Sequence, residues 1–139
     1  MTAMTTISNR LNASTDSLLR FAMRLDAALS GLAGIATVIF ARQLAELSGT
    51  SVGVEYTIGV FFVAFAVGVL VLAARPAVRM PGLLLAIGNV LFTVATVVVV
   101  LAGVWPLTAA GVALVLGTGV YTLVMAELQY QGLRRITKA

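Results

Sequence analysis

The chain contains no cysteine and no histidine among its 139 residues. Without cysteine it has no disulfide bond, no thiolate nucleophile and no sulfur ligand for a metal. Without histidine it has no imidazole base, no histidine-ligated haem and no histidine-based zinc or copper site. We therefore predict no metal and no cofactor, and we expect a protein that is not an enzyme.

Charge is also scarce, since charged residues make up 10% of the sequence and hydrophobic residues 60%. The mean hydropathy of +1.08 is too high for a surface exposed to water, so the composition predicts a multi-pass membrane protein with one domain. In a soluble protein the net charge of +4 would suggest nucleic acid. Here the basic residues stand at the ends of apolar segments, so no nucleic-acid partner is predicted.

Four apolar segments are long enough to cross a bilayer, because about 20 helical residues span a hydrocarbon core of about 30 Å. We expect an all-α, four-helix transmembrane bundle with a single membrane domain over residues 14–135. A flexible tail is expected at 1–13 and a short tail at 136–139. The spans are predicted at about 15–47, with Ser14 or Thr15 as the first cap, and at 56–74, 82–101 and 106–135.

The distribution of basic residues predicts the orientation. Eight of the nine Lys and Arg residues fall on the side of the two termini and the 75–81 loop, and Arg42 alone falls on the other side. Basic residues are enriched in cytoplasmic loops. Both termini are therefore predicted to be cytoplasmic, and the protein is predicted to lie in the cell membrane, the inner membrane of a bacterium.

Three spans carry a polar side chain at one depth, namely Asp26, Asn89 and Glu127. At 1.5 Å per residue each lies about 9 to 12 Å from the predicted cytoplasmic boundary. We expect these residues to form an intramembrane polar layer, with Tyr130 as a further hydrogen-bonding group.

This polar layer has two interpretations. As a site, its two carboxyl groups would hold a proton or bind a cationic headgroup. As structural glue, Asn89 would bond across helices and the two acids would pair with arginines. The expected ion-pair partners of Glu127 are Arg20 and Arg24.

Two further surfaces are predicted from helical spacing. Ala109, Ala113 and Gly117 form a row of small residues that permits a neighbouring backbone to approach, and the two alanines lie within about 40° of Glu127 around the helix. This row predicts that Glu127 faces the protein interior. Phe61 and Phe65 lie on one side of the second span, which has little polar character, and they predict a surface for lipid or for a partner protein.

Three stretches resemble small four-span integral membrane proteins of high-GC Gram-positive bacteria that have no assigned activity. They are RLDAALSGLAG in the first span, GNVLF in the third and AELQYQGLRR at the end of the fourth. The resemblance implies the four-span fold. It assigns no functional residue.

The leading functional hypothesis is a non-catalytic accessory or scaffold subunit that packs in the bilayer against a larger membrane protein complex or forms a homo-oligomer. It rests on the short loops and on the absence of redox and metal ligands. The alternative is a small transporter or lipid-handling protein that uses the layer of Asp26, Asn89 and Glu127. A membrane enzyme with acid–base chemistry is third, because only Asp26 and Glu127 could supply a paired acid and base.

Overall fold

The computed structural model describes residues 15–138, so the predicted tail at 1–13 and the predicted cap at Ser14 lie outside the described residues. Its elements, in chain order, are α2 (Ser17–Ile39), α3 (Ala41–Ser48), α4 (Val52–Ala73), α5 (Arg79–Ala102) and α6 (Ala109–Lys138). All except α3 are long and apolar enough to cross a membrane. The prediction of an all-α, four-helix membrane bundle is therefore confirmed.

Local sequence explains where the helices begin and end. The hydroxyl of Ser51 accepts a hydrogen bond from the backbone N–H of Val54 at 3.2 Å and caps the start of α4. Thr108 does the same for α6, where its hydroxyl accepts from the N–H of Gly111 at 3.0 Å. Gly103 ends α5 with φ +64°, a left-handed conformation that costs other residues energy.

The first predicted helix is not continuous. The sequence predicted one helix over about 15–47, but the backbone breaks at Phe40, with φ −104° and ψ 25°. The short helix α3 that follows buries Ala41, Ala45 and Ser48, and it contacts both α4 and α6. After the break, the small-residue face of α3 therefore packs between α4 and α6.

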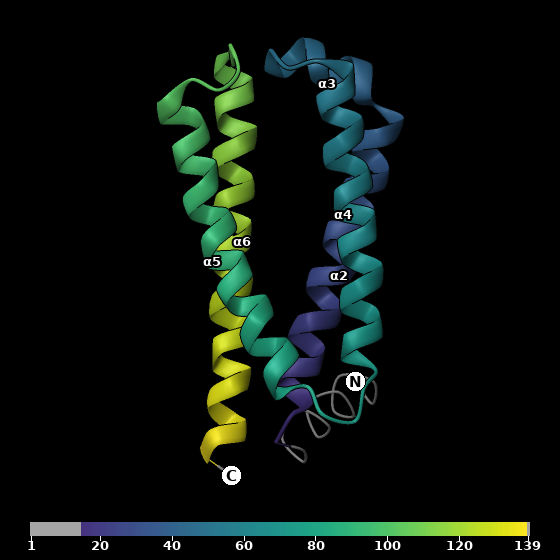
Figure 1. Cartoon of the computed structure of the whole chain (residues 1–139), viewed down its shortest axis with the longest axis vertical. Coiled ribbons are helices and arrows are strands. Elements are labelled where there is room, and N and C mark those ends of the chain that lie inside the picture. The colour runs from purple at the N-terminus through teal and green to yellow at the C-terminus, as the bar shows by residue number, and fades with distance from the viewer. Residues whose placement is uncertain (1–14, 139) are drawn as a thin grey trace, which may run out of the picture.

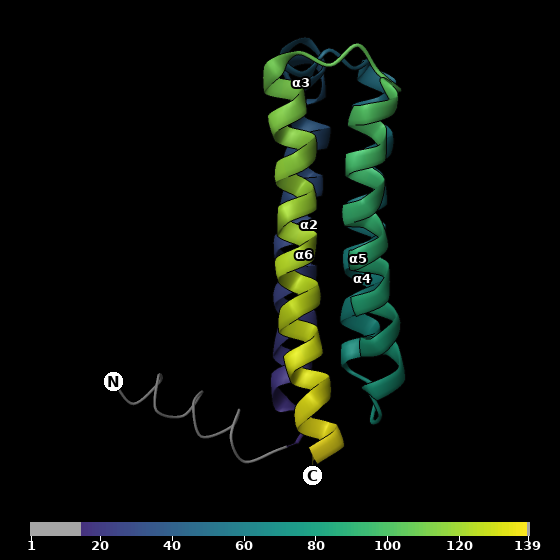
Figure 2. The ribbon, with the colours of Figure 1, turned by 90° about the vertical axis from the view of Figure 1, so that its left-hand side faces the viewer.

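The four long helices form two pairs, α2 with α4 and α5 with α6, and contacts between α2 and α6 join the pairs. Figure 1 shows the pairs standing apart over much of their length, with α5 leaning toward α2 at the end where the chain termini lie. We call this the terminal end and the opposite end the far end. Figure 2, turned by 90°, shows the long helices running roughly parallel to the vertical axis, with α2 and α6 on one side and α4 and α5 on the other. Within the described residues, α4 and α5 have almost no close backbone contact.

Glycine allows α2 and α4 to approach closely. A Cβ atom added at Gly34 would lie 2.7 Å from the carbonyl oxygen of Gly59 and 2.9 Å from the Cβ of Phe62. A Cβ at Gly59 would in turn lie 2.8 Å from the carbonyl oxygen of Gly34. The crossing of these helices therefore requires glycine at both positions.

The predicted row of small residues on α6 does not pack against another helix. Ala109, Ala113 and Gly117 are all exposed, and a Cβ at Gly117 would meet nothing within 4 Å. Close approaches of α6 occur instead at Gly111, Gly119 and Gly132, where an added Cβ would collide with Ser48, Thr96 and Leu19, respectively. The prediction was wrong because α6 is rotated so that its threonine-bearing face meets α5.

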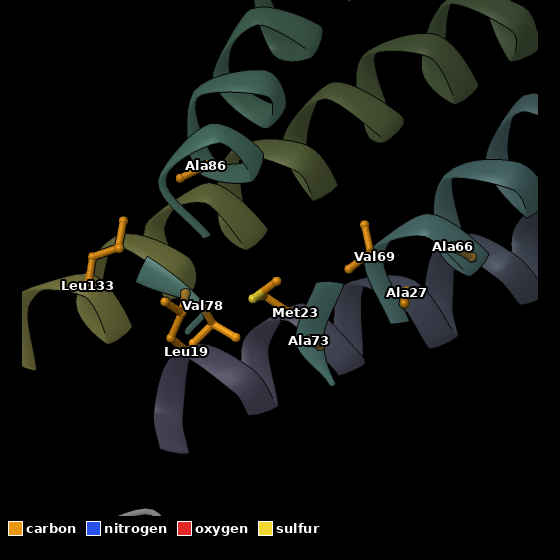
Figure 3. Close-up of a cluster of buried hydrophobic side chains, with 9 residues drawn as sticks. All are labelled: Leu19, Met23, Ala27, Ala66, Val69, Ala73, Val78, Ala86 and Leu133. Atoms are coloured by element: carbon orange, nitrogen blue, oxygen red, sulfur yellow. The ribbon is translucent and has the colours of Figure 1, made fainter. Parts of the chain in front are cut away.

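A cluster of apolar side chains closes the bundle at the terminal end, as Figure 3 shows. Leu19 and Met23 of α2 are fully buried there, and Val78 from the 74–78 loop packs against them. The other members of this cluster are Ala27, Ala66, Val69, Ala73, Ala86 and Leu133. This cluster therefore joins the two helix pairs at the terminal end, and at the far end they are joined by the backbone N–H of Thr108, which donates to the carbonyl oxygen of Ser48 at 3.0 Å.

The predicted orientation can be tested with single cysteines, because the natural chain has none. Ala77 lies exposed in the terminal-end loop, and Val104 lies exposed in the far-end loop. With both termini in the cytoplasm, an impermeant maleimide added to intact cells should label Val104→Cys and leave Ala77→Cys unlabelled until the cells are opened. Labelling of Ala77→Cys from outside would reverse the orientation.

Candidate functional site

The most deeply buried charged residue of the spans, Asp26, accepts four hydrogen bonds. Its Oδ1 accepts from the Tyr121 hydroxyl at 2.7 Å and from the Ser30 hydroxyl at 3.1 Å. Its Oδ2 accepts at 2.9 Å from both Asn89 Nδ2 and Gln129 Nε2. Asp26 is 0% exposed. Because a carboxylate has about four acceptor positions, this set of donors suits the ionised group.

The residues around Asp26 also bond to one another. Asn89 Nδ2 donates a second hydrogen bond to Gln129 Oε1 at 3.0 Å, and the Ser30 and Tyr121 oxygens lie 3.3 Å apart. We call these five residues the Asp26 cluster. Its members come from α2, α5 and α6, so the cluster ties the two helix pairs together next to the apolar cluster of the terminal end.

A set of threonines extends the polar contact between α5 and α6. The Thr93 hydroxyl lies 2.7 Å from that of Thr122 and donates to the carbonyl oxygen of Gly119 at 2.9 Å. Thr96 is buried one turn further toward the far end. Asn89, Thr93 and Thr96 therefore lie on a face of α5 that is directed at the protein interior.

A cavity of about 930 Å³ lies between the two helix pairs and is lined by α2, α4, α5 and α6. Its polar lining residues are Ser30, Asn89, Thr118, Tyr121 and Thr122, and the other lining residues are apolar or glycine. Among the described residues that form this wall, none carries a formal charge. The Asp26 cluster thus presents its neutral members to the cavity and holds the carboxylate behind them.

On one side of the cavity α4 and α5 face each other with almost no close backbone contact, and we call this side the α4–α5 seam. The rings of Phe62 and Phe92 meet across this seam with centroids 6.0 Å apart. Phe61 and Phe65, whose ring centroids lie 6.3 Å apart, also line the cavity. The two phenylalanines that were predicted to form a surface for lipid or for a partner protein therefore line the cavity.

The structure brings together two members of the predicted polar layer, Asp26 and Asn89, and leaves Glu127 outside it. Glu127 is exposed, and its Oε1 accepts a hydrogen bond from Gln131 Nε2 at 2.7 Å. Tyr130 is also exposed, 52% by area, with the Arg134 guanidinium 5.8 Å from its ring centroid. The prediction that Glu127 faces the protein was wrong, because Gln129 takes the inward position and two residues correspond to about 200° around a helix.

The predicted ion-pair partners of Glu127 have other surroundings. Arg20 pairs with Asp16 at 2.9 Å and donates to the carbonyl oxygens of Ala73 at 2.8 Å and Arg75 at 2.6 Å. A third carbonyl oxygen, that of Pro76, accepts at 2.7 Å. Arg20 therefore caps the C-terminal end of α4, whose last carbonyl groups lack helical partners. Arg24 is exposed.

Sequence reasoning missed Ser30, Tyr121 and Gln129 as parts of one cluster. A signal for Gln129 was present, because it lies seven residues after Thr122 and two helical turns place both on one face. A second buried acid also escaped notice. Glu55 at the far end is 7% exposed, and its Oε2 accepts from the Thr50 hydroxyl at 2.6 Å.

No protein-family model, curated protein or solved structure matches the chain. The resemblance to uncharacterised four-span bacterial proteins therefore stays a prediction, and function has to be argued from the cavity and the Asp26 cluster.

Proposed function

We propose that this protein is a non-catalytic, lipid-handling membrane protein that binds one lipid-like molecule in the cavity between its two helix pairs. The observation that carries the proposal is the cavity itself, about 930 Å³ in volume, apolar over most of its wall and bordered by the α4–α5 seam, where the two helices have almost no close backbone contact. This volume is near the upper end of the range of about 300–1,000 Å³ for small-molecule sites.

The position of the cavity favours a lipid over a water-soluble ligand. It lies between four helices that are long and apolar enough to span a membrane, so its opening faces the hydrocarbon region. Each water molecule in a filled cavity needs polar partners, and most residues of this wall are apolar or glycine and offer none. A hydrocarbon chain matches the remaining surface without leaving any polar group unpaired.

The Asp26 cluster gives the site a fixed polar wall. Because the carboxylate accepts from α2, α5 and α6, these helices keep one relative position at the depth of the cavity. A ligand then meets a preformed surface, which lowers the entropic cost of binding. In this proposal Asp26 is a positioning residue and does not touch the ligand.

The accessory-subunit function remains a second candidate, and one observation favours it. The α4–α5 seam has almost no close backbone contact, and a helix of a larger membrane protein or of a second copy could cover it. A lipid chain could occupy the same seam. The lipid-handling function therefore predicts a bound lipid there, and the accessory-subunit function predicts a bound protein helix.

Cavity-filling variants test the proposal. Gly88 and Gly117 line the cavity, and a Cβ at either position would meet nothing within 4 Å. Leucine at these positions should therefore fill space without disturbing helix packing. Protein purified in mild detergent should carry about one tightly held lipid by native mass spectrometry, and Gly88→Leu and Gly117→Leu should lose most of it.

The matched control is Ala28→Leu, which adds a similar side chain at an exposed position away from the cavity wall. This variant should retain the lipid. The proposal fails if the natural protein holds no lipid beyond the loosely bound shell, or if the filled variants retain it. A stoichiometric co-purifying protein that is released by Gly88→Leu would place the accessory function first.

A further inference from the structure

Hydrogen-bond donors on the cavity wall are all used within the protein. The Ser30 and Tyr121 hydroxyls donate to Asp26, at 3.1 and 2.7 Å. The Thr118 hydroxyl donates to the carbonyl oxygen of Leu114 at 2.8 Å, and that of Thr122 donates to the carbonyl oxygen of Gly119 at 2.9 Å. The wall therefore offers a ligand acceptor oxygens and no free hydroxyl donor in the described part of the chain.

One acceptor is left without a partner. Asn89 directs its Nδ2 atom to Asp26 and Gln129, and this fixes its Oδ1 atom on the other side of the amide. No hydrogen bond to Oδ1 forms within residues 15–138, although Asn89 is only 5% exposed. Every fully buried side-chain nitrogen or oxygen there has a partner, so Oδ1 keeps an open side, and the free space beside Asn89 is the cavity.

An open carbonyl oxygen in an apolar cavity indicates what the ligand should carry. Leaving a polar group unpaired away from water costs free energy, and hydrocarbon cannot relieve that cost. The hydrogen bonds that the Asn89 amide donates also polarise it and make Oδ1 a stronger acceptor. The missing partner is therefore a hydrogen-bond donor supplied by the ligand.

The cavity disfavours both an anionic and a cationic ligand. The wall has no Lys or Arg to pair with a phosphate or a carboxylate, and the Asp26 carboxylate behind Asn89 opposes an anion. A cation would be removed from water without touching an anion, because Asp26 is fully buried behind its donors. A neutral donor meets neither penalty.

We propose that the molecule bound in this cavity is a neutral lipid with a free hydroxyl group, such as a long-chain alcohol or an acylglycerol, and that its hydroxyl donates to Asn89 Oδ1. This inference rests on the proposed lipid-binding function and names the ligand class of the same cavity. It separates this site from sites for phospholipids, fatty acids and quinones, whose head groups need donors or cations.

The test varies the ligand and leaves the protein intact. Delipidated protein in an amine-oxide detergent, which has no hydroxyl group, is titrated with radiolabelled oleyl alcohol, and oleyl methyl ether and oleylamine compete for binding. Alcohol and ether differ by one donor hydrogen, so the alcohol should bind about tenfold more tightly, the factor expected for one hydrogen bond to a buried acceptor. It should also bind more tightly than the amine.

Two variants assign the preference to a residue. Asn89→Leu should bring the ratio of alcohol to ether affinity close to one, whereas Thr118→Val, also on the wall, should leave the ratio near tenfold. If Asn89→Leu does not fold, the comparison of alcohol and ether on the natural protein decides alone. Equal affinities, tighter binding of the amine, or a phospholipid as the retained molecule would overturn the hydroxyl assignment while leaving lipid binding in place. Failure of every probe to bind, with no lipid retained on purification, would instead refute the proposed function.

Discussion

Asp26→Asn should destabilise the protein by about 3 kcal/mol, measured as the free energy of unfolding in mixed detergent micelles. The substitution keeps the size of the side chain but turns one acceptor oxygen into an N–H₂ donor. That donor would then face either the Ser30 and Tyr121 hydroxyls or the amides of Asn89 and Gln129. In the first case the Tyr121 hydroxyl can still donate to the backbone carbonyl oxygen of residue 26, 3.2 Å away, and the Ser30 hydroxyl loses its acceptor. In the second case both amides lose their acceptor, and each such loss costs about 1–3 kcal/mol.

Glu127→Gln is the matched control. It makes the same chemical change in an acid that is exposed and that contacts only Gln131 among the described residues, so its effect should stay within about 0.5 kcal/mol. If Asp26→Asn were as mild as this control, Asp26 would have to be protonated in the folded protein. The four-donor arrangement around an ionised carboxylate would then be wrong.

Exchanging the two residues gives a sharper test of the same cluster. In Asp26→Asn/Asn89→Asp the carboxylate moves from α2 to α5, where it can still accept from Gln129 and from the new amide at position 26. That amide can turn its own oxygen toward Ser30 and Tyr121. The double variant should therefore recover part of the stability lost in Asp26→Asn, whereas independent sites would show additive losses.

Much of the fold could be predicted from the sequence, because span length and hydropathy depend on composition within each segment. The four spans and the interior face with Asn89, Thr93 and Thr96 follow from periodicity alone. The break at Phe40 does not, since no proline or glycine marks it, and the α3 helix that follows it packs on two other helices. Contacts that depend on tertiary packing leave little local signal.

The candidate site could be predicted only in part. Depth along each span selected Asp26 and Asn89, which the structure brings into contact, but depth says nothing about rotation around the helix axis. At the end of α6 several polar residues occur within one turn, and Gln129 points inward while Glu127 points outward. Glu127 attracts attention in the sequence because it is charged. A buried position next to the Asp26 carboxylate instead favours the neutral amide of Gln129, which can donate a hydrogen bond to it. The cavity had no sequence signal, because it depends on how far the two helix pairs diverge.

Gly34→Val should destabilise the protein by about 2–3 kcal/mol in the same unfolding measurement, because the residue lies where α2 and α4 come closest. A Cβ at this position would be 2.7 Å from the backbone oxygen of Gly59, and a backbone atom cannot move aside as a flexible side chain can. The helices would have to separate, and their contacts on both sides of the crossing would weaken.

A control on the partner helix separates this packing effect from the general effect of replacing a glycine. A Cβ at Gly68 of α4 would meet nothing within 4 Å, so Gly68→Ala should be neutral or stabilise the helix by up to about 1 kcal/mol. Gly34→Ala should fall between this control and Gly34→Val, because its single methyl group still meets the Gly59 oxygen. A Gly34→Val protein as stable as Gly68→Ala would mean that α2 and α4 do not cross at these glycines, and the α2–α4 wall of the cavity would then need a different arrangement.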